Sequence, residues 1–209
     1  PSSIAVSLGL PGGGSAPPFD LEIGAEPNRI VLADWNADGV MDIAVMSNSS
    51  RTVTVLLGQG GTAFGPGIVT AAGTSPFRRE TADLNGDGRA DLVVDDPLAK
   101  TFIPLLGRGD GNFDAAASPL LQGFPQGFAI GDWNGDGFPD IVMAEVEPGG
   151  ISVSYGDGSG QFTMGPRVPI PTGVFGTGGA GDVAIGDLEG DGLPDLVAAT
   201  STNNFLAAA

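Results

Sequence analysis

Residues 34–42 read Asp-Trp-Asn-Ala-Asp-Gly-Val-Met-Asp, and this arrangement of acids around a glycine occurs four times along the chain. The copies at 83–91 and 132–140 keep Asp-x-Asn-x-Asp-Gly-x-x-Asp, and the first three copies start 49 residues apart. The fourth copy, at 187–195, keeps the internal spacing but has Glu189 in place of the asparagine. Carboxylates at alternate positions around a glycine turn wrap oxygen ligands around a hard cation, most commonly calcium. The chain is therefore predicted to be a calcium-binding repeat array.

In each loop, we expect the side chains at the first, third, fifth and ninth positions to bind the cation. The residue at the seventh position is expected to bind it through the backbone carbonyl, and the glycine at the sixth position permits the sharp turn. One calcium ion per loop, and so about four in total, is the expectation. The predicted ligands are Asp34, Asn36, Asp38, Val40 and Asp42; Asp83, Asn85, Asp87, Arg89 and Asp91; Asp132, Asn134, Asp136, Phe138 and Asp140; and Asp187, Glu189, Asp191, Leu193 and Asp195.

A second pattern has the same period of 49 residues and consists of a glycine that follows a short apolar run. These glycines are Gly9, Gly58, Gly107 and Gly156. Three of them are followed by a Gly-rich turn and an aromatic residue, again 49 residues apart: Phe64, Phe113 and Phe162. Two interleaved patterns with one period indicate a supersecondary unit that must stack on copies of itself to bury its apolar face.

Short apolar runs of four to six residues, rich in β-branched types, flank each loop, as 30–33 and 43–46 flank the first one. Such runs are typical of β-strands, which places each loop at the tip of a hairpin. With one strand before each periodic glycine and one after each aromatic residue, the unit has four short strands. The predicted fold is all-β, a β-propeller of four-stranded antiparallel blades with about four repeats of ~49 residues.

The expected domain organisation is a single propeller region over residues 1–209. Residues 1–29 are assigned to the end of a first blade, 30–78, 79–127 and 128–182 to three blades, and 183–209 to the start of a further blade. The chain starts and stops in the same type of strand, so we expect it to be part of a larger propeller. A four-bladed ring closed by the N-terminal strands is the alternative. The polar stretch 80–82 replaces an apolar innermost strand, so the second blade is expected to be weaker or differently packed.

Taken together, the Asp-x-Asn-x-Asp-Gly-x-x-Asp loop between the first two strands and the Gly-rich turn with phenylalanine before the last strand resemble FG-GAP (VCBS-type) repeats. Such repeats build integrin α-subunit propellers, some fungal lectins and many bacterial surface proteins. The resemblance covers nearly the whole chain. It implies a propeller whose blades each carry a calcium ion in the first hairpin, and which serves mostly in adhesion or ligand binding.

The charge of the chain limits its partners. The formal net charge is -17, and 13 of the 25 acids lie in the four loops, where they would repel one another without a bound cation. With only 8 Lys and Arg residues and no basic stripe, nucleic acid is not an expected partner. No run of 18 apolar residues is present, so no membrane-spanning segment is expected. The absence of cysteine and the need for free calcium favour an extracytoplasmic location: secreted, cell-surface or periplasmic.

Three functions remain open at this point. The first, which we favour, is a protein-binding, adhesion or scaffolding module, possibly a subunit of a larger surface or periplasmic assembly. The second is a lectin that binds a surface glycan. The third is a polysaccharide lyase or hydrolase, which needs a pair of carboxylates in a central cleft. The chain has no His and no Cys, so Ser-His-Asp and Cys-His sites are excluded and no catalytic residue is predicted.

Four other features have simpler interpretations. Trp35 and Trp133 could stack on sugars, but Leu84 and Leu188 occupy the same loop position, which favours packing against a neighbouring blade. The tripeptide Arg-Gly-Asp at 108–110 lies in an ordinary repeat turn. The basic pair at 78–79 is expected in a solvated turn, or else in contact with an acidic partner. An insertion around 171–181 could be a binding loop or a plain connector.

Overall fold

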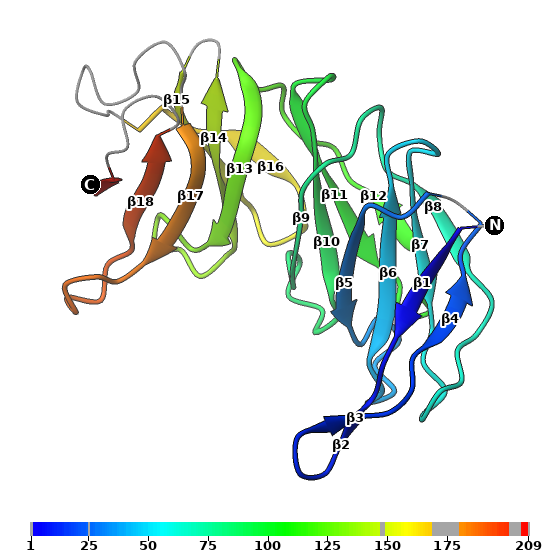
Figure 1. Cartoon of the computed structure of the whole chain (residues 1–209). Coiled ribbons are helices and arrows are strands. Elements are labelled where there is room, and N and C mark those ends of the chain that lie inside the picture. Colours follow the sequence, from blue (N-terminus) through cyan, green and yellow to red (C-terminus); the bar gives the residue numbers. More distant parts are fainter. Residues whose placement is uncertain (1, 25, 147–148, 169–179, 201–205, 209) are drawn as a thin grey trace.

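The computed structural model describes residues 2–24, 26–146, 149–168, 180–200 and 206–208. The insertion around 171–181 lies almost entirely outside these residues. Within the described ranges, the regular elements are all β-strands (Figure 1). The prediction of an all-β fold is therefore confirmed. No helix among the described residues has the length and apolar character needed to cross a membrane.

Three four-stranded antiparallel sheets follow one another along the chain, each with its strands in sequence order. The first consists of β5 (Arg29–Ala33), β6 (Asp42–Ser47), β7 (Thr52–Leu56) and β8 (Ile68–Ala71). The second consists of β9 (Arg79–Ala82), β10 (Asp91–Asp96), β11 (Thr101–Gly107) and β12 (Phe113–Ala115). The third consists of β13 (Phe124–Gly131), β14 (Asp140–Val146), β15 (Gly150–Gly156) and β16 (Phe162–Met164).

Smaller sheets lie before and after these three. On the N-terminal side, one pair is β1 (Ser3–Val6) with β4 (Phe19–Glu22), and the other is β2 (Gly9–Leu10) with β3 (Gly14–Ser15). On the C-terminal side, a three-stranded sheet consists of β17 (Ala180–Gly186), β18 (Asp195–Thr200) and β19 (Leu206–Ala208).

Each acidic loop joins the first and second strands of a sheet. In the first sheet, Ala33 pairs with Asp42 at the end of the β5–β6 ladder, so residues 34–41 form the tip of the hairpin. The β9–β10, β13–β14 and β17–β18 hairpins end in the same way. The polar stretch 80–82 also forms a regular strand, β9, which pairs with β10. The four loops therefore hold equivalent places in four successive sheets.

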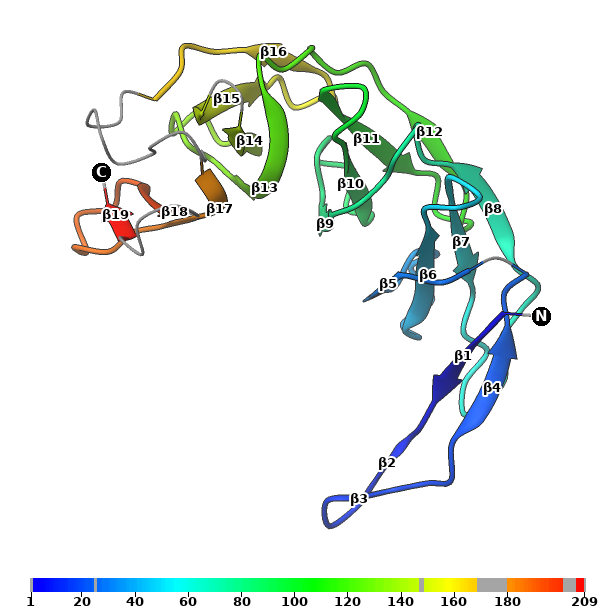
Figure 2. The ribbon, with the colours of Figure 1, turned by 45° about the horizontal axis from the view of Figure 1, so that its top comes forward.

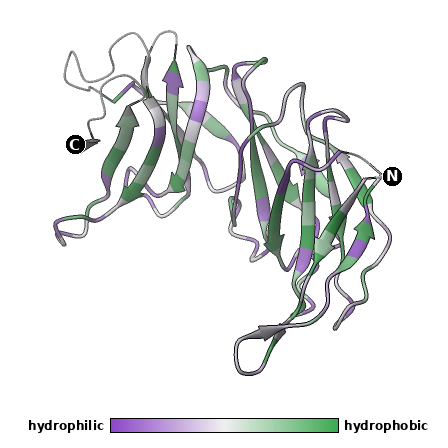
Figure 3. Ribbon diagram, viewed as in Figure 1, coloured by the Kyte–Doolittle hydropathy of each residue, from purple (hydrophilic) through white to green (hydrophobic). Residues whose placement is uncertain are grey.

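The second strand of each four-stranded sheet is buried on both faces. In β10, Leu92 and Val94 belong to the core cluster shared with the preceding sheet, whereas Val93 belongs to the cluster shared with the following one. The same alternation occurs in β6 and β14, since successive side chains of a strand point to opposite faces. Figure 3 shows this concentration of hydrophobic residues in the sheets. Each sheet thus packs face to face on its neighbours.

The sheets are arranged in an arc, with β5, β9, β13 and β17 along its concave side (Figure 2). Contacts between β5 and β9, between β9 and β13, and between β13 and β17 connect these inner strands. The strands β8, β12 and β16 lie on the outer side. Within the described residues, no sheet closes on itself. The antiparallel four-stranded sheets and their fan-like order are those of propeller blades.

Candidate metal centre

The first acidic loop is held by hydrogen bonds from its own backbone. Asp34 accepts from the N–H groups of Asp38 through Oδ1 (3.1 Å) and of Gly39 through Oδ2 (2.8 Å). Asn36 Oδ1 also accepts from Asp38 N–H (3.1 Å), and Asp38 Oδ1 accepts from Val40 N–H (2.7 Å). These short-range bonds from side-chain oxygens replace the backbone pairing that a tight hairpin tip lacks. The alternating polar residues therefore determine the shape of the loop.

The second and third loops repeat this network, bond for bond. The fourth loop keeps the bonds to Asp187 and the bond from Leu193 N–H to Asp191 Oδ1 (2.8 Å). In this described loop, Glu189 does not make the bond that the asparagine makes in the other three. Backbone bonds from Gly192 and Gly190 lower the pKa of Asp187, so this carboxyl is ionised at neutral pH.

Two positions of each loop have a left-handed backbone. The expected one is the sixth position, where Gly39 has φ 84° and the glycines of the other loops have φ between 80° and 91°. The second is the fourth position, where three loops have glycine and the first has Ala37 with φ 57°. Alanine adopts this conformation only at an energetic cost. The fourth position was missed from the sequence, although the glycine found there in three of the four copies was a usable signal.

The ninth-position aspartates of the first three loops are buried and have both oxygens bonded, whereas Asp195 is partly buried and accepts from Leu188 N–H through Oδ2 (2.7 Å). Asp42 Oδ2 accepts from Trp35 N–H (2.8 Å), and Oδ1 accepts from Gly58 N–H (2.7 Å). The equivalent pairs, Asp91 with Gly107 (2.7 Å) and Asp140 with Gly156 (3.0 Å), repeat the second bond. The two periodic patterns of the sequence are therefore physically joined, since the last residue of the loop binds the periodic glycine 16 positions later.

Close packing explains why these positions are glycine. A Cβ atom added to Gly58 would lie 2.6 Å from the carbonyl oxygen of Met41 and 2.8 Å from Val40 Cγ1. At Gly107 and Gly156, an added Cβ would likewise collide with the carbonyl of the residue before the aspartate. Gly9 has the same place in the sequence pattern, but open space surrounds it. Three of the four periodic glycines are thus required by a close approach of two backbones.

Burial raises the pKa of Asp42 above its ordinary value, and the bonds from Gly58 and Trp35 act in the opposite direction. The charges of Asp38 and Asp34 raise this pKa further, which shows that the loop carboxylates lie close enough to repel one another. The pKa values of Asp91 and Asp140 are raised by burial in the same way. A cation held by the loop would relieve this repulsion.

The loops fit calcium in the kind of donor they provide. Every predicted side-chain donor is a carboxylate or amide oxygen, the chemistry that a hard cation prefers. The hydrogen bonds also leave lone pairs on these oxygens, because an ionised carboxylate accepts at about four sites. The side chains are directed at backbone N–H groups, however, and no three His, Cys, Asp or Glu side chains within the described residues converge as a metal centre requires. Calcium therefore remains a prediction.

The second position of the loops serves packing, as the sequence indicated. Trp35 is 2% exposed and meets Phe113 of the next sheet edge to face, with ring centroids 5.2 Å apart. Leu84 is equally buried, and Trp133 is partly buried against the core cluster of the following pair of sheets. Leu188 differs, since it is 62% exposed. The tryptophans therefore connect neighbouring sheets.

Two short motifs acquire a structural explanation. The arginine of the Arg-Gly-Asp tripeptide is held by Asp114, to which Arg108 donates through Nε (2.8 Å) and Nη2 (2.6 Å). This bidentate pair keeps the tripeptide in its turn. The expectation that the basic pair 78–79 lies in a solvated turn is wrong for Arg79, which begins strand β9 and is partly buried. The strand extends to this residue because it pairs with Val94 of β10.

Comparison with known proteins agrees with this architecture. A family profile described as FG-GAP-like repeat matches residues 34–94 and 132–198. No curated protein matches the chain. Among solved structures, the crystal structure of the V. cholerae biofilm matrix protein Bap1 is similar, with a TM-score of 0.51 and 18% identity over 86% of this chain and 26% of that chain. A crystal structure of BBS1N in complex with ARL6DN gives a TM-score of 0.45 and 13% identity over 95% of this chain and 72% of that chain.

The chain thus spans about a quarter of the length of Bap1, and at this identity the likeness is one of fold. The family profile, by contrast, covers more than half of the chain and includes all four acidic loops in full. On this match and on the repeated hairpin loops, the protein belongs to the family of FG-GAP-like repeat proteins.

Proposed function

We propose that this chain is a calcium-stabilised, extracytoplasmic β-propeller segment that acts as a protein-binding, adhesion or scaffolding module. The observation that carries the proposal is the set of four equivalent hairpin loops, each with oxygen donors at the same positions and a shared backbone conformation. The carboxylate repulsion within the first loop supports a bound cation, since residues 34–42 contain no Lys or Arg that could neutralise it. The likeness to a biofilm matrix protein supports an extracytoplasmic role in adhesion.

The test is thermal unfolding in calcium and in chelator, on the wild type and two variants of equal charge. Asp38→Asn removes a predicted ligand but keeps the acceptor for Val40 N–H, whereas Asp20→Asn removes an exposed carboxylate of β4. At a calcium concentration ~100 times the dissociation constant, each site contributes about 2.7 kcal/mol of stability. Calcium should therefore raise the melting temperature of the wild type and of Asp20→Asn more than that of Asp38→Asn.

In chelator, the melting temperature of Asp38→Asn should be higher than those of the wild type and Asp20→Asn, because Asp38→Asn relieves repulsion inside the loop. Direct titration should also find one calcium ion fewer in Asp38→Asn than in Asp20→Asn. A melting temperature that does not respond to calcium would remove the metal from the proposal, and the loops would then be hairpin turns stabilised by their own side chains.

We also propose that the arc belongs to a larger propeller, with the blade boundaries that the repeats suggest. The open arc of face-to-face sheets supports this, because each four-stranded sheet has an apolar partner on either side. The mass of the natural protein and a low-resolution envelope of it are the measurements that distinguish a larger ring from a four-bladed one. Fractionation of producing cells tests the location, which we expect to be the medium, the cell surface or the periplasm.

One observation favours a hydrolase as a second candidate. Glu80 and Asp182 both line a pocket of about 200 Å³ where residues of the second, third and fourth sheets meet. Burial raises the pKa of Glu80, and the charge of Asp182 raises it further, whereas Asp182 is paired with Arg78 (3.4 Å). Glycosidases use a pair of carboxyl groups, and the raised pKa of Glu80 makes it the candidate acid. Release of reducing sugar from acidic and neutral polysaccharides by the wild type, abolished in Glu80→Gln, would establish this function.

A further inference from the structure

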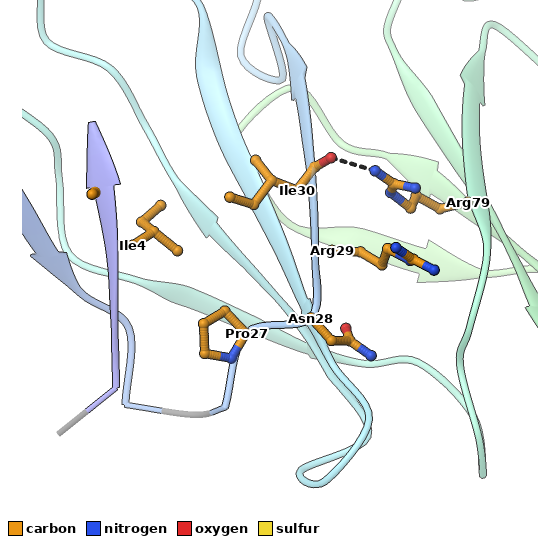
Figure 4. Close-up of a pocket in the computed structure, with 7 residues that line it drawn as sticks. Ile4, Pro27, Asn28, Arg29, Ile30 and Arg79 are labelled. Carbon is orange, nitrogen blue, oxygen red and sulfur yellow. Dashed lines mark hydrogen bonds between the residues drawn. The ribbon is translucent and has the colours of Figure 1, made fainter. Parts of the chain in front are cut away.

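Three of the eight cationic side chains gather at the inner strands, although the protein as a whole is strongly acidic. Arg29 is the first residue of β5, and Arg79 is the first residue of β9. Arg78 directly precedes β9. Figure 4 shows Arg29 and Arg79 extending to the same side of β5, where Arg79 donates through Nη2 to the carbonyl oxygen of Ile30. The neighbouring sheets thus bring two guanidinium groups together.

Within the described residues, neither Arg29 nor Arg79 forms an ion pair. Arg29 instead lies over the ring of Phe77, 5.2 Å from its centroid. Arg79 Nε is buried and has no hydrogen-bond partner. Burial, and secondarily the charge of Arg29, lower the pKa of Arg79, yet an arginine stays protonated at neutral pH. Two like charges therefore lie close together beside the same space.

This space is an open pocket of about 370 Å³ across the inner edge of β5. Ile4, Pro27 and Ile30 line one side of it, and Arg29 and Arg79 line the other (Figure 4). A volume in this range is typical of small-molecule sites, in which apolar walls hold the body of the ligand and a few polar groups orient it. One half of the pocket is thus suited to an apolar group and the other half to an anion.

We propose that this pocket binds a small monocarboxylate, with the carboxylate between Arg29 and Arg79 and a short apolar body against Ile4, Pro27 and Ile30. Guanidinium groups recognise planar carboxylates through paired N–H donors, and Arg29 and Arg79 both line this pocket. A single negative charge is favoured because the net charge of -17 repels an anion in proportion to the charge that it carries.

None of the residues that line this pocket is an acid. Glu80 and Asp182 lie with Arg78 and Arg79 in the separate, smaller pocket toward the third and fourth sheets. Asp182 pairs with Arg78, and Glu80 is held by Ile130 of β13. The carboxylate site uses none of the residues of the acidic loops, so it does not depend on the calcium proposal.

The test is calorimetric titration with 4-methylpentanoate at low ionic strength, on the full chain in saturating calcium. The neutral amide of the same acid and inorganic phosphate are the comparison ligands. We expect the acid to bind and the amide not to bind. Arg79→Gln should raise the dissociation constant by about tenfold or more, which corresponds to the loss of one charged hydrogen bond. Arg29→Gln should have an effect of the same order.

Arg51→Gln is the matched control, because it removes the same charge from an exposed turn between β6 and β7. Its dissociation constant should stay within about twofold of the wild-type value. Equal loss in Arg51→Gln and Arg79→Gln would overturn the proposal in favour of general electrostatic attraction. Equal binding of the amide, or tighter binding of phosphate, would overturn the carboxylate assignment. Thermal melts check that each variant is folded. If Arg79→Gln does not fold, the comparison of Arg29→Gln with Arg51→Gln tests the proposal.

Discussion

The bond between the loop aspartate and the periodic glycine offers the sharpest test of the structure. In the first repeat, Gly58→Ala would place a Cβ atom 2.6 Å from the carbonyl oxygen of Met41 and 2.8 Å from Val40 Cγ1. The first of these atoms belongs to the backbone, so a side-chain rotation cannot relieve the clash. Gly58 must then move away from the hairpin, which lengthens its bond of 2.7 Å to the carboxylate of Asp42.

The size of the effect follows from three contributions. A lost hydrogen bond to a charged group costs about 1.5–3 kcal/mol when the group is buried, as Asp42 is. Overpacking adds about 1–3 kcal/mol of strain. The lower backbone entropy of alanine in the unfolded chain returns roughly 0.4–1 kcal/mol. We therefore expect Gly58→Ala to lower the free energy of unfolding by about 2–5 kcal/mol.

The assay is urea unfolding in saturating calcium, followed by tryptophan fluorescence. Trp35 is a suitable reporter, since its backbone N–H group donates to the other carboxylate oxygen of Asp42. The matched control is Gly9→Ala, which changes the same residue type at the same place in the 49-residue pattern. Because open space surrounds Gly9, its replacement should alter stability by no more than about 0.5 kcal/mol.

Equal effects of the two substitutions would refute this reasoning, because the sequence pattern treats these glycines as equivalent and only their surroundings distinguish them. A Gly58→Ala variant within about 1 kcal/mol of the wild type would do the same, since the close approach of the two backbones would then have no energetic consequence.

Three further predictions concern single residues. Burial raises the pKa of Asp95 to about 6 in the fold, above 3.8 in the unfolded chain, so stability is lost as pH rises from about 4 to 6. In urea unfolding, Asp95→Asn should therefore raise the free energy of unfolding by about 2 kcal/mol at pH ~7.5 and change it little at pH ~4. Ala37→Gly should raise the free energy of unfolding by about 0.5–1 kcal/mol, because it removes a left-handed alanine. Trp35→Ala should lower the free energy of unfolding by about 3–5 kcal/mol, and Trp133→Ala by roughly half as much, because Trp133 is less buried. Similar losses in the two variants would contradict the packing assignment.

Much of the architecture could be predicted from the sequence because it is local. A hairpin tip needs a left-handed glycine and polar side chains that bind the backbone, and both are visible within nine residues. The flanking runs form strands because they alternate between two buried faces, which requires apolar residues at successive positions. The apolar second position of the loop was also correctly assigned to packing for Trp35 and Leu84.

The connections between these local features could not be predicted. The bond from Gly58 to Asp42 joins residues 16 positions apart, and neither residue type alone indicates the other. The surroundings of Gly9 differ from those of its counterparts, although the pattern is the same. Arg79 was misplaced because an adjacent basic pair usually lies at the surface, whereas here β9 pairs as far as this residue. The pocket near Arg29 is formed by three segments distant in sequence, so no motif could reveal it.

The alternation along the second strands has a consequence for how the protein opens. Since Val93 contacts one neighbouring sheet and Leu92 and Val94 contact the other, each interface is formed by a different set of side chains. Loosening one interface therefore leaves the set on the opposite face in place, and disruption passes only to the next sheet. Amide hydrogen exchange should follow this order: β10 is protected from both sides and should exchange last, with protection decreasing stepwise toward the sheets at either end of the arc.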